Sequence, residues 1–549
     1  MDRQKTVKAI ENGNTILGIE LGSTRIKGVL IDENHSPIAA GEYAWESSCE
    51  DGIWTYSLDA VWQGLQACYR SLADAVQTRY QVVLRRIGAM GISGMMHGYL
   101  AFDESGDQLT AFRTWRNTMT QRAAEALTAL FSFNIPQRWS IAHLYQAMLE
   151  HEPHVQNVAY LTTLAGYIHW QLTGRKVIGI GDASGMFPID SVTGDYSRRM
   201  LAQFQNRAEQ MGYFWKIASI LPRVLSAGEA AGTLTKRGAQ LLDPTGQLQA
   251  GVPLCPPEGD AGTGMTATNS VSVHTGNVSA GTSIFSMVVL NQPLGAVYPQ
   301  IDMVTTPDGA PVAMVHCNTC TSELDAWVGL FLELLAASGS AMDKAELYTM
   351  LYTMALREDA DPSGMVSYNC YAGEPVVELD AGCPMFARLP DTQLGLAGFM
   401  RAQLFSAMAA LRVGMDILFD KERVHLDYLV GHGGLFKTKG VGQRIMASAL
   451  NVPVCVLDTA GEGGAWGIAL LAAYMKNRTA NEPLAAYLSE RVFGTGSAAS
   501  EQPDEALRGS FDQFLQCYRA CLPAEREAAH ALRKTAGKQP YKNRRRKIR

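Results

Sequence analysis

The chain is 549 residues long, which is more than one ordinary hydrophobic core serves, so we expect two domains of roughly 200 to 250 residues each. Hydrophobic residues make up 47% and charged residues 18%, a composition typical of a globular protein and not of a disordered one. The formal net charge of −6 argues against a general nucleic-acid-binding protein, because such a protein needs a basic face for the phosphates.

Cysteine spacing and the N-terminal residues predict a cytoplasmic protein. The ten cysteines lack the spacing of a disulfide framework, and the opening MDRQKTVKAIENGN lacks the apolar core of a signal peptide. No charge-free run of about 18 apolar residues predicts a membrane span. One Cys-x-x-Cys, Cys317 to Cys320, has no second pair, so we expect two buried thiols there and not a zinc site. The basic end, KNRRRKIR from Lys542, is expected to be a solvated tail.

The first predicted element is a β-hairpin over residues 16–32, ILGIELGSTRIKGVLID. Its turn is Gly22, Ser23 and Thr24, with Glu20 before the turn and Lys27 after it. Glu20 and Lys27 fit an ordinary cross-strand ion pair or solvated strand ends. They also fit a phosphate-binding turn, in which backbone amides, hydroxyls and the lysine contact the anion while the glutamate faces a metal ion.

Alternating helix and strand patterns after the hairpin predict an α/β protein. Apolar residues recur at helical spacing from Leu58, and RRIGAMGISG then reads as a buried strand that runs into a Gly-rich loop. Further helices are predicted at 121–130 and 160–174. A stretch rich in Pro and Gly leads to a loop at 259–264, which we interpret as the edge of a domain.

The second half of the chain repeats the pattern of the opening hairpin. VSVHTGNVSAGTSIFSMVVL, from Val271, reads as a strand, a turn of small residues and a second strand. Long helices are predicted at 323–337 and 396–419. LDYLVGHGGLFKTKGVGQRIMASALNVPVCVL, from Leu426, reads as strand, Gly-rich loop, helix and strand, and AGEGGAWGIALLAAYM places glycines at the start of a further helix. A loop from Gly494 precedes one or two C-terminal helices.

Two phosphate-type turns that face each other would hold a nucleotide, whereas other nucleotide motifs are weak or missing. No G-x-x-x-x-G-K-[ST] occurs, and the dinucleotide fingerprint fits only loosely at Gly262-x-Gly264-x-x-Ala267, after a Pro-rich loop. Instead, the order of motifs over roughly residues 14–480 resembles the FGGY family of carbohydrate kinases, in the superfamily of actin, sugar kinases and Hsp70 ATPases.

The resemblance implies an α/β protein with two actin-like (ribonuclease H-like) domains and a cleft between them. It places an N-terminal sugar-binding and catalytic domain at 14–267 and a C-terminal ATP-binding domain at 268–480. Residues 481–549 would form a C-terminal extension with the basic tail.

The resemblance also assigns ATP and Mg²⁺ contacts. The family hairpin D-x-G-T/S-x-x-x-K/R is matched from Glu20 to Lys27. It implies that ATP contacts a first turn, formed by Gly22, Ser23 and Thr24, together with Lys27. It also implies contacts from a second turn, Gly281, Thr282 and Ser283, and from an adenosine loop that contains Gly433, Gly434 and Lys437. Glu20, the implied metal-side carboxylate, stands where the family usually has Asp, so its extra methylene brings it closer to the metal or makes it act through water.

The segment GDAGTG matches a family motif in which the Asp is the catalytic base, and that residue is Asp260 here. The chemistry agrees, because a sugar hydroxyl is a poor nucleophile and needs a carboxylate within hydrogen-bond reach to accept its proton. Taken alone, Asp260 also fits a residue that caps a turn between glycines. The order of the motifs favours the catalytic role.

The sugar pocket implied by the resemblance includes Met96, His97 and Asp260. GISGMMHG resembles the GISGQMHG of xylulokinases, and LAGYIHWQLTG with GDASG at Gly181 matches the helix and loop behind the sugar. TWRNTMT corresponds to a W-N-D-x-R segment, with Trp115 as an apolar wall and Asn117 in place of the Asp. The loss of that carboxylate changes the hydrogen bonds available to a sugar.

We therefore predict an ATP- and Mg²⁺-dependent kinase that phosphorylates a small sugar, with a ketopentose such as xylulose or ribulose as the expected substrate. Its partners would be small molecules, with no nucleic acid or membrane, and a homodimer is considered. Two alternatives stay open: an actin- or Hsp70-like ATPase, and an inactive kinase-like sugar sensor that the substitutions at Glu20 and Asn117 would permit.

Overall fold

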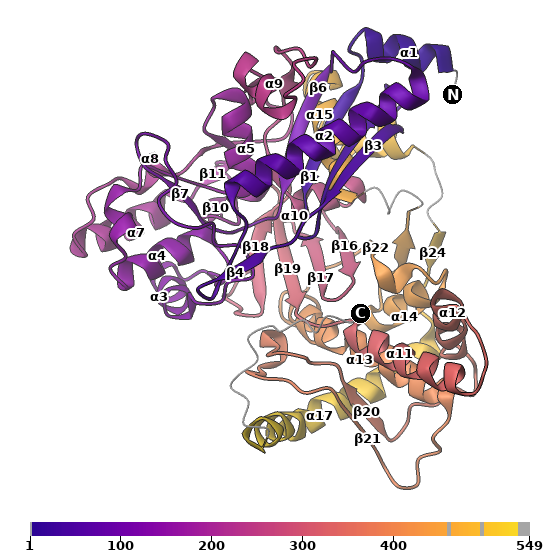
Figure 1. Ribbon diagram of the computed structural model, residues 1–549. Coiled ribbons are helices and arrows are strands. Elements are labelled where there is room, and N and C mark those ends of the chain that lie inside the picture. Colours follow the sequence, from indigo (N-terminus) through magenta and orange to yellow (C-terminus); the bar gives the residue numbers. More distant parts are fainter. Residues whose placement is uncertain (1–2, 458–462, 495–498, 536–549) are drawn as a thin grey trace.

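The computed structural model describes residues 3–457, 463–494 and 499–535, which form two α/β domains, each built on a seven-stranded sheet (Figure 1). The basic tail from Lys542 and parts of the segments predicted from Ala460 and Gly494 lie outside the described residues.

The first sheet confirms the predicted hairpin. β1 pairs antiparallel with β2 and parallel with β6, and Glu20 lies directly opposite Lys27 in the register. The strand order is β13-β14-β6-β1-β2-β3, and β15 also pairs with β6. The strands are β1 (Ile16–Leu21), β2 (Arg25–Ile31), β3 (Pro37–Ala44), β6 (Ala89–Gly94), β13 (Gly232–Thr233), β14 (Pro253–Leu254) and β15 (Glu258–Gly259).

Two helices from opposite ends of the chain cover this sheet, because each presents an apolar side to one of its faces. α2 (Leu58–Tyr80) packs against β2 and β3, and α15 (Gly463–Asn477) packs against β1 and β6. The helical segment at the left of Figure 1 belongs to the same domain. The domain's other helices are α1 (Arg3–Glu11), α3 (Gln121–Phe131), α4 (Ser140–Leu149), α5 (Leu164–Thr173), α6 (Ile180–Ala183), α7 (Arg198–Gln210), α8 (Ile217–Ile220), α9 (Lys236–Leu242) and α10 (Asp260–Ala267).

Short strands complete this domain. They are β4 (Ser48–Glu50), β5 (Ile53–Thr55), β7 (Leu100–Phe102), β8 (Tyr160–Thr162), β9 (Val177–Gly179), β10 (Ile189–Asp190), β11 (Asp195–Tyr196) and β12 (Arg223–Leu225).

Helix α15 lies directly against β1, and Gly18 permits this approach. A Cβ at Gly18 would lie 2.0 Å from the Ala465 carbonyl oxygen and 2.7 Å from the Ala469 nitrogen.

We expect Gly18→Ala to lower the free energy of unfolding by about 1–3 kcal/mol, because the helix must move off the sheet. Urea unfolding measures the change. Gly329→Ala is the matched control, since nothing lies within 4 Å of a Cβ there; an equal loss of stability in both variants would contradict the prediction.

The second sheet repeats the arrangement, and its hairpin is also confirmed. β16 pairs antiparallel with β17 and parallel with β22, in the order β18-β19-β17-β16-β22-β23-β24. The strands are β16 (Thr275–Ala280), β17 (Ile284–Val289), β18 (Ile301–Thr305), β19 (Pro311–Cys317), β22 (Tyr428–His432), β23 (Val454–Val456) and β24 (Ala499–Glu501). Around them lie α11 (Ser322–Ala337), α12 (Lys344–Met354), β20 (Met365–Tyr368), β21 (Met385–Arg388), α13 (Leu396–Asp416), α14 (Val441–Leu450) and α17 (Glu505–Thr535).

The two faces of β17 belong to different hydrophobic cores. Ile284 and Val288 join the core beneath α13 and α14, whereas Met287 and Val289 pack with residues of the first domain. Because side chains alternate across a strand, one strand serves both cores. Thr305, at the end of β18, adds hydrogen bonds to Ser184 Oγ (3.1 Å) and the Ile180 carbonyl (3.0 Å). The two domains therefore share a packed interface.

Several predicted elements differ in detail from the structure. The loop predicted at 259–264 is wrong, because α10 begins at Asp260. The helix predicted at 160–174 begins only at Leu164, where the Thr163 hydroxyl caps it by accepting a hydrogen bond from the Gly166 amide. The divisions at 267/268 and 480/481 stay a prediction, but the packing crosses them: α15 lies on the first sheet, and α17 packs into the second core.

Helix α13, continued by a π-helical turn to Lys421, is long and apolar enough to span a membrane by length and composition alone. Most of its apolar stretch is buried inside the second domain, as in the core helix of a globular protein. Cys317 and Cys320 are both buried, which agrees with the expected thiols.

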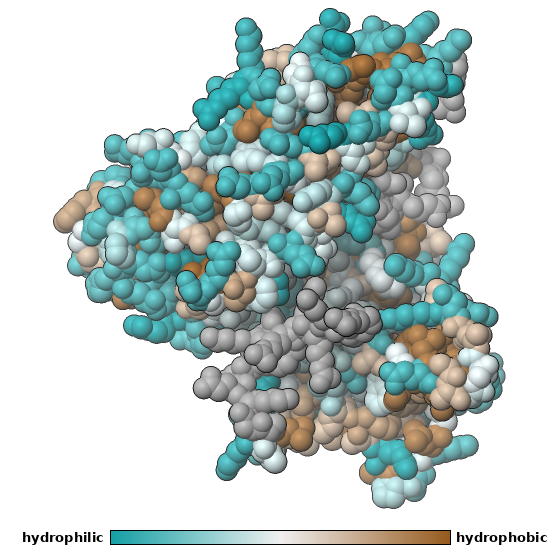
Figure 2. All heavy atoms as spheres, in the orientation of Figure 1, coloured by the Kyte–Doolittle hydropathy of each residue, from teal (hydrophilic) through white to brown (hydrophobic). Residues whose placement is uncertain are grey.

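An exposed apolar patch lies over α11 and α12, where Figure 2 shows hydrophobic side chains in the lower domain. Leu330 is 52% exposed and Leu334 66% exposed. Patches of this kind often mark protein contacts. The homodimer considered from the sequence stays a prediction.

Candidate active site

Three parallel strand ends of the first sheet meet at one edge and carry the predicted catalytic residues. β1 and β15 both run parallel to β6, with Glu20 and Glu258 opposite Ser93 in the register. The chain therefore leaves all three strands at the carboxyl edge, where ligands bind in open α/β sheets. Glu20, Met96 and Asp260 lie at this edge.

Asp260 is the first residue of α10, and its carboxylate accepts a hydrogen bond from the Met96 N–H at 3.0 Å. The side chain is exposed to solvent, yet the surrounding protein atoms raise its pKa by desolvation, against the hydrogen bonds from the Met96 and Ala261 amides. The carboxylate can thus reach a bound molecule and has a raised affinity for a proton, as a general base requires.

His97 lies beside Asp260 on the neighbouring loop, in the left-handed backbone region with φ of 70°. Its ring is buried, stacks against Trp139, and donates from Nδ1 to the Gly185 carbonyl oxygen at 3.3 Å. Burial, and then the charge of Arg138, hold the pKa of His97 well below its usual value. The ring is therefore neutral, and Nε2 is left with a lone pair that can accept a hydrogen bond.

Two buried carboxylates lie behind Asp260 and were not identified from the sequence. The Thr163 hydroxyl donates to Asp182 Oδ2 at 2.6 Å, and Asp182 Oδ1 has no hydrogen-bond partner among the described residues. Glu258 accepts the amides of Gly181 (3.1 Å) and Asp182 (2.9 Å). Burial, followed by negative neighbours, raises the pKa of each carboxyl to about 8. The GDASG motif was the only sequence signal for Asp182.

An ion pair between the two domains lies close to His97 and was also missed by the sequence analysis. Arg138, just before α4, pairs with Asp302 on β18, and Asn134 donates to the same carboxylate at 3.1 Å. Burial, followed by the Arg138 charge, lowers the pKa of His316 on β19 to about 3. The polar surroundings of His97 thus include residues of both domains.

Glu20 lies against the N-terminus of α15. Its Oε2 accepts the Ala465 N–H at 3.2 Å, and a Cβ at Gly464 would lie 2.3 Å from Oε1. Burial and then the negative charge of Asp260 raise the pKa of Glu20 to about 7, while Lys27 acts in the opposite direction. Neighbouring carboxylates that repel one another are suited to a divalent cation, which prefers oxygen ligands and would relieve the repulsion.

The first phosphate-type turn is held in place by aromatic donors. Trp45 Nε1 donates to the Gly22 carbonyl at 2.8 Å, and the Tyr56 hydroxyl donates to the Ser23 carbonyl at 2.6 Å. Trp115, 37% exposed, contacts the same turn, because its Nε1 donates a hydrogen bond to Ser23 Oγ at 3.3 Å. Thr24 is exposed beside it. The structure thus places Trp115 at this turn, and its contact with a sugar stays a prediction.

Asn117 is buried, and its carboxamide binds the backbone. Oδ1 accepts the Trp54 N–H at 2.9 Å, while Nδ2 donates to the carbonyls of Trp54 and Thr114, both at 2.9 Å. The carboxamide anchors the segment that carries Trp54, over which the Arg116 guanidinium stacks at 3.7 Å from the ring centroid. A direct sugar contact from Asn117 remains a prediction without support from these contacts.

Asn117→Asp tests this anchoring role. The substitution replaces two donated hydrogen bonds by a carboxylate that faces two carbonyl oxygens, so we expect a loss of about 1–3 kcal/mol in unfolding free energy. Thermal and urea unfolding measure it, with the exposed Asn34→Asp as control. Unchanged stability together with an altered preference among sugars would show instead that Asn117 contacts the substrate.

The second group of predicted residues lies at the carboxyl ends of β16 and β22. Gly281 accepts hydrogen bonds on its carbonyl from the Thr321 N–H (3.0 Å) and hydroxyl (2.7 Å), which orders the turn through Thr282 and Ser283. Gly433 has φ of 103°, and a Cβ there would lie 2.4 Å from the Ala280 carbonyl. Gly433 therefore allows the adenosine loop to approach the turn, and Gly434 and Lys437 are exposed beside it.

Comparison with known proteins supports this reading of the two sheets. The chain is 23% identical to a xylulose kinase of Escherichia coli over 60% of this chain and 67% of that protein. It is 22% identical to an autoinducer-2 kinase of Salmonella paratyphi B over 63% of this chain and 64% of that protein. The crystal structure of a xyloylose kinase from Brucella ovis superposes with a TM-score of 0.72, 21% identity, and coverage of 94% of this chain and 100% of that one.

Two family models match most of the chain. Residues 15–265 match the N-terminal domain, and residues 276–475 the C-terminal domain, of the FGGY family of carbohydrate kinases. The structural neighbours have the actin-like two-domain fold that the resemblance implied. With both domain models matched in order over most of its length, this chain belongs to the FGGY family of carbohydrate kinases and is an ATP-dependent sugar kinase.

Proposed function

We propose that this kinase transfers the γ-phosphoryl group of ATP to a hydroxyl of a small polyhydroxy substrate such as a ketopentose, with Asp260 as the general base. The observation that carries the proposal is the Asp260 carboxylate, which is held by the Met96 amide next to the neutral His97 ring and remains open to solvent. In this arrangement Asp260 accepts the hydroxyl proton, while His97 orients a second hydroxyl of the substrate.

The nucleotide site in this proposal is formed by the two turns. Gly22 and Gly281 shape the two turns, because their amides donate within the turns to the Arg25 and Ser283 carbonyls, both at 2.9 Å. The amides and hydroxyls of Ser23 and Thr24 would then contact phosphate oxygens from the first sheet, and those of Thr282 and Ser283, beside Gly433, would do so from the second. Lys27, opposite Glu20 on β2, adds positive charge near the first turn. Backbone amides in such turns favour phosphate oxygens.

Mg²⁺ in this proposal is held on the side of Glu20. The residues fit a hard cation, because the Glu20 carboxylate supplies oxygen ligands and the negative charge of Asp260 nearby adds to the attraction for a cation. The ion would neutralise charge that develops on the transferred group. Glu20 is fixed by the α15 amides, so its orientation does not depend on the cation.

The substrate is the part of the proposal that needs a direct experiment. Purified kinase is tested for ADP release with ATP, Mg²⁺ and a panel that contains ketopentoses, polyols, gluconate and autoinducer-2. Stimulation by one ketopentose supports the proposal, and stimulation by another class corrects the substrate. Brisk ATP turnover without any sugar would favour the actin- or Hsp70-like ATPase. The absence of ATP turnover with every compound in the panel would favour the inactive sensor.

The raised carboxyl pKa values predict an unusual dependence on pH. Asp260 must be deprotonated to accept a proton, and desolvation raises its pKa above that of an ordinary aspartate. Desolvation, followed by the charge of Asp260, raises the pKa of Glu20 to about 7. We expect kcat/KM to begin falling as the pH falls through about 7, where Glu20 gains a proton, and to fall further as Asp260 is protonated. Because Mg²⁺ and protons compete for Glu20, a higher Mg²⁺ concentration should shift the acid limb to lower pH. Rate profiles at two Mg²⁺ concentrations test this; superimposable profiles would contradict it.

A further inference from the structure

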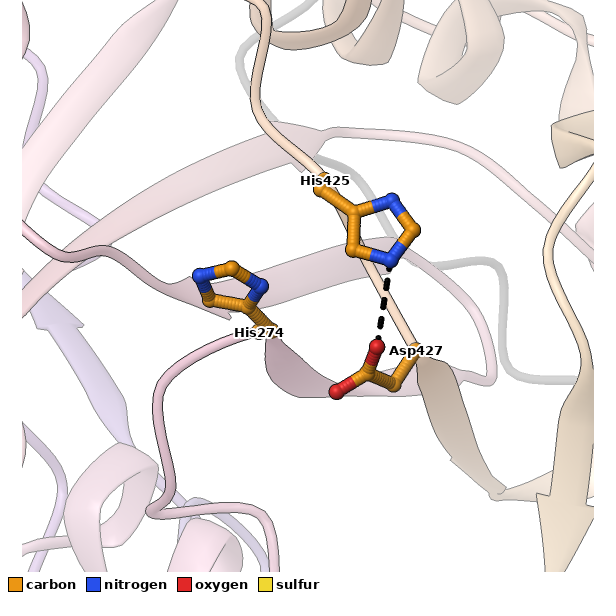
Figure 3. Close-up of side chains that lie close together, drawn as sticks. All are labelled: His274, His425 and Asp427. Carbon is orange, nitrogen blue, oxygen red and sulfur yellow. Dashed lines mark hydrogen bonds and ion pairs between the residues drawn. The ribbon is translucent and has the colours of Figure 1, made fainter.

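Two histidines and an aspartate meet where the second sheet begins, away from the residues considered above (Figure 3). β16 and β22 pair in parallel with Thr275 opposite Tyr428, so His274 and Asp427, which stand just before these two strands, lie side by side. The Asp427 N–H donates to the His274 carbonyl oxygen at 2.8 Å. His425 lies two residues before Asp427 and turns its ring toward the Asp427 carboxylate.

The spacing of the three side chains fits the first shell of a metal ion. One ligand atom from each lies within 4.8 Å of the others, and His425 Nε2 is 3.1 Å from Asp427 Oδ1. Two ligands of a tetrahedral ion with bonds of about 2.0–2.1 Å are about 3.3 Å apart. His425 and Asp427 are therefore already spaced as two ligands, and His274 offers its ligand atom within 4.8 Å of theirs.

The orientation of the His274 ring is set by the contact that its Nε2 makes with Asn291. Nε2 lies 2.8 Å from Asn291 Nδ2, and Figure 3 shows a ring nitrogen of His274 on the side of His425 and Asp427. If the Asn291 amide turns so that Oδ1 accepts the Nε2 proton, Nδ1 keeps its lone pair for a metal. A histidine ligand that donates its second N–H to an oxygen is the usual arrangement in metal sites.

We propose that His274, His425 and Asp427 bind a divalent transition-metal ion of the zinc class, with water as the remaining ligand. Imidazole nitrogens with one carboxylate suit Zn²⁺, Co²⁺, Ni²⁺ or Cu²⁺, whereas Mg²⁺ prefers an all-oxygen set. The site is distinct from the magnesium side at Glu20. It also lacks buried ligands, since His425 and Asp427 are exposed and His274 is half-buried, so a free ion can enter from solvent.

The metal would join the starts of the two strands whose other ends carry the nucleotide-binding loops. β16 leads to the turn at Gly281, and β22 leads to Gly433. Cross-linking the two strands, and binding only the folded chain, should raise the melting temperature of the protein with the metal concentration. This inference is independent of the identity of the sugar.

The full chain, stripped of metal with a chelator, is titrated with ZnCl₂ by calorimetry and with Co²⁺ by visible absorption. We expect one saturable site, tetrahedral Co²⁺ bands, and a rise in melting temperature. His425→Gln and Asp427→Asn should each weaken Zn²⁺ binding at least about tenfold, since loss of an outer-shell partner alone typically costs 10–100-fold. His530→Gln, which changes an exposed histidine on α17, should leave the affinity unchanged.

Two results would overturn the inference: absence of saturable Zn²⁺ binding to the wild-type chain, or wild-type affinity in both His425→Gln and Asp427→Asn. Cys49→Ser removes the exposed thiol, and loss of the site in that variant alone would assign the ion to Cys49 instead. The altered residues are exposed, so melting temperatures in chelator should match the wild type and show that the fold is retained.

Discussion

Asp260→Asn should lower kcat by about 10² to 10⁴, the usual contribution of a general base. The amide keeps the shape of the side chain, and its oxygen can still accept the Met96 N–H, which is 3.0 Å from the native carboxylate. It cannot accept the hydroxyl proton. Binding of the sugar should therefore change little, and the acid limb that Asp260 contributes to the rate profile should disappear.

Steady-state rates, sugar affinity by calorimetry and a melting curve together test Asp260. Asp74→Asn, on the exposed side of α2, is the matched control and should behave as the wild type. An Asp260→Asn variant within a few-fold of wild-type kcat would remove Asp260 from the role of base. Loss of sugar binding with normal folding would instead make Asp260 a binding residue.

Glu20→Ala should reduce kcat by about 10² to 10³, in the range found when one preorganised electrostatic contact is removed. The magnesium requirement should rise, because the cation would lose a negative neighbour. Glu20→Asp should retain substantial activity with a changed magnesium dependence, since the carboxylate survives and only its reach changes. Lys27, opposite Glu20, can hold ATP more tightly once the glutamate is gone, so kcat and nucleotide affinity both need measurement.

Gly464→Ala offers a second way to disturb the same carboxylate, because its Cβ would lie 2.3 Å from Glu20 Oε1. It moves the carboxylate without removing its charge, and it should alter the magnesium dependence as well. Glu104→Ala, at an exposed turn, serves as control. If Glu20→Ala keeps wild-type turnover and magnesium dependence, Glu20 is a hairpin residue that caps α15 and has no role at the metal.

Local patterns in the sequence were sufficient for the two hairpins and for the order of the motifs. Apolar runs on either side of Gly-Ser-Thr or Gly-Thr-Ser make β1–β2 and β16–β17 predictable, since strands and tight turns depend on near neighbours. The same order of motifs indicated the FGGY family and two actin-like domains. Asp260 was identified as the base by this route, and that role stays a prediction that the geometry supports.

Residues that depend on distant partners could be placed only by the tertiary structure. Small residues made 259–264 look like a loop, but the helix α10 begins at Asp260. It packs so closely against α15 that a Cβ at Gly467 would lie 2.0 Å from the Thr263 carbonyl. Trp115 lies at the phosphate-type turn, and Asn117 binds the backbone of Trp54, which no local pattern indicates.

The clusters of charged groups also form only in the tertiary structure, although the sequence supplies their residues. Glu20, Asp182 and the segment with Glu258 and Asp260 come from three separate parts of the chain, and His274 meets His425 and Asp427 only because β16 and β22 are adjacent. The sequence by itself determined the residue types, the hairpins and the family, since these follow from local spacing and motif order. Strand pairing and helix packing decided which charges lie together, and the electrostatic energy that sets their pKa values and ion binding depends on those distances.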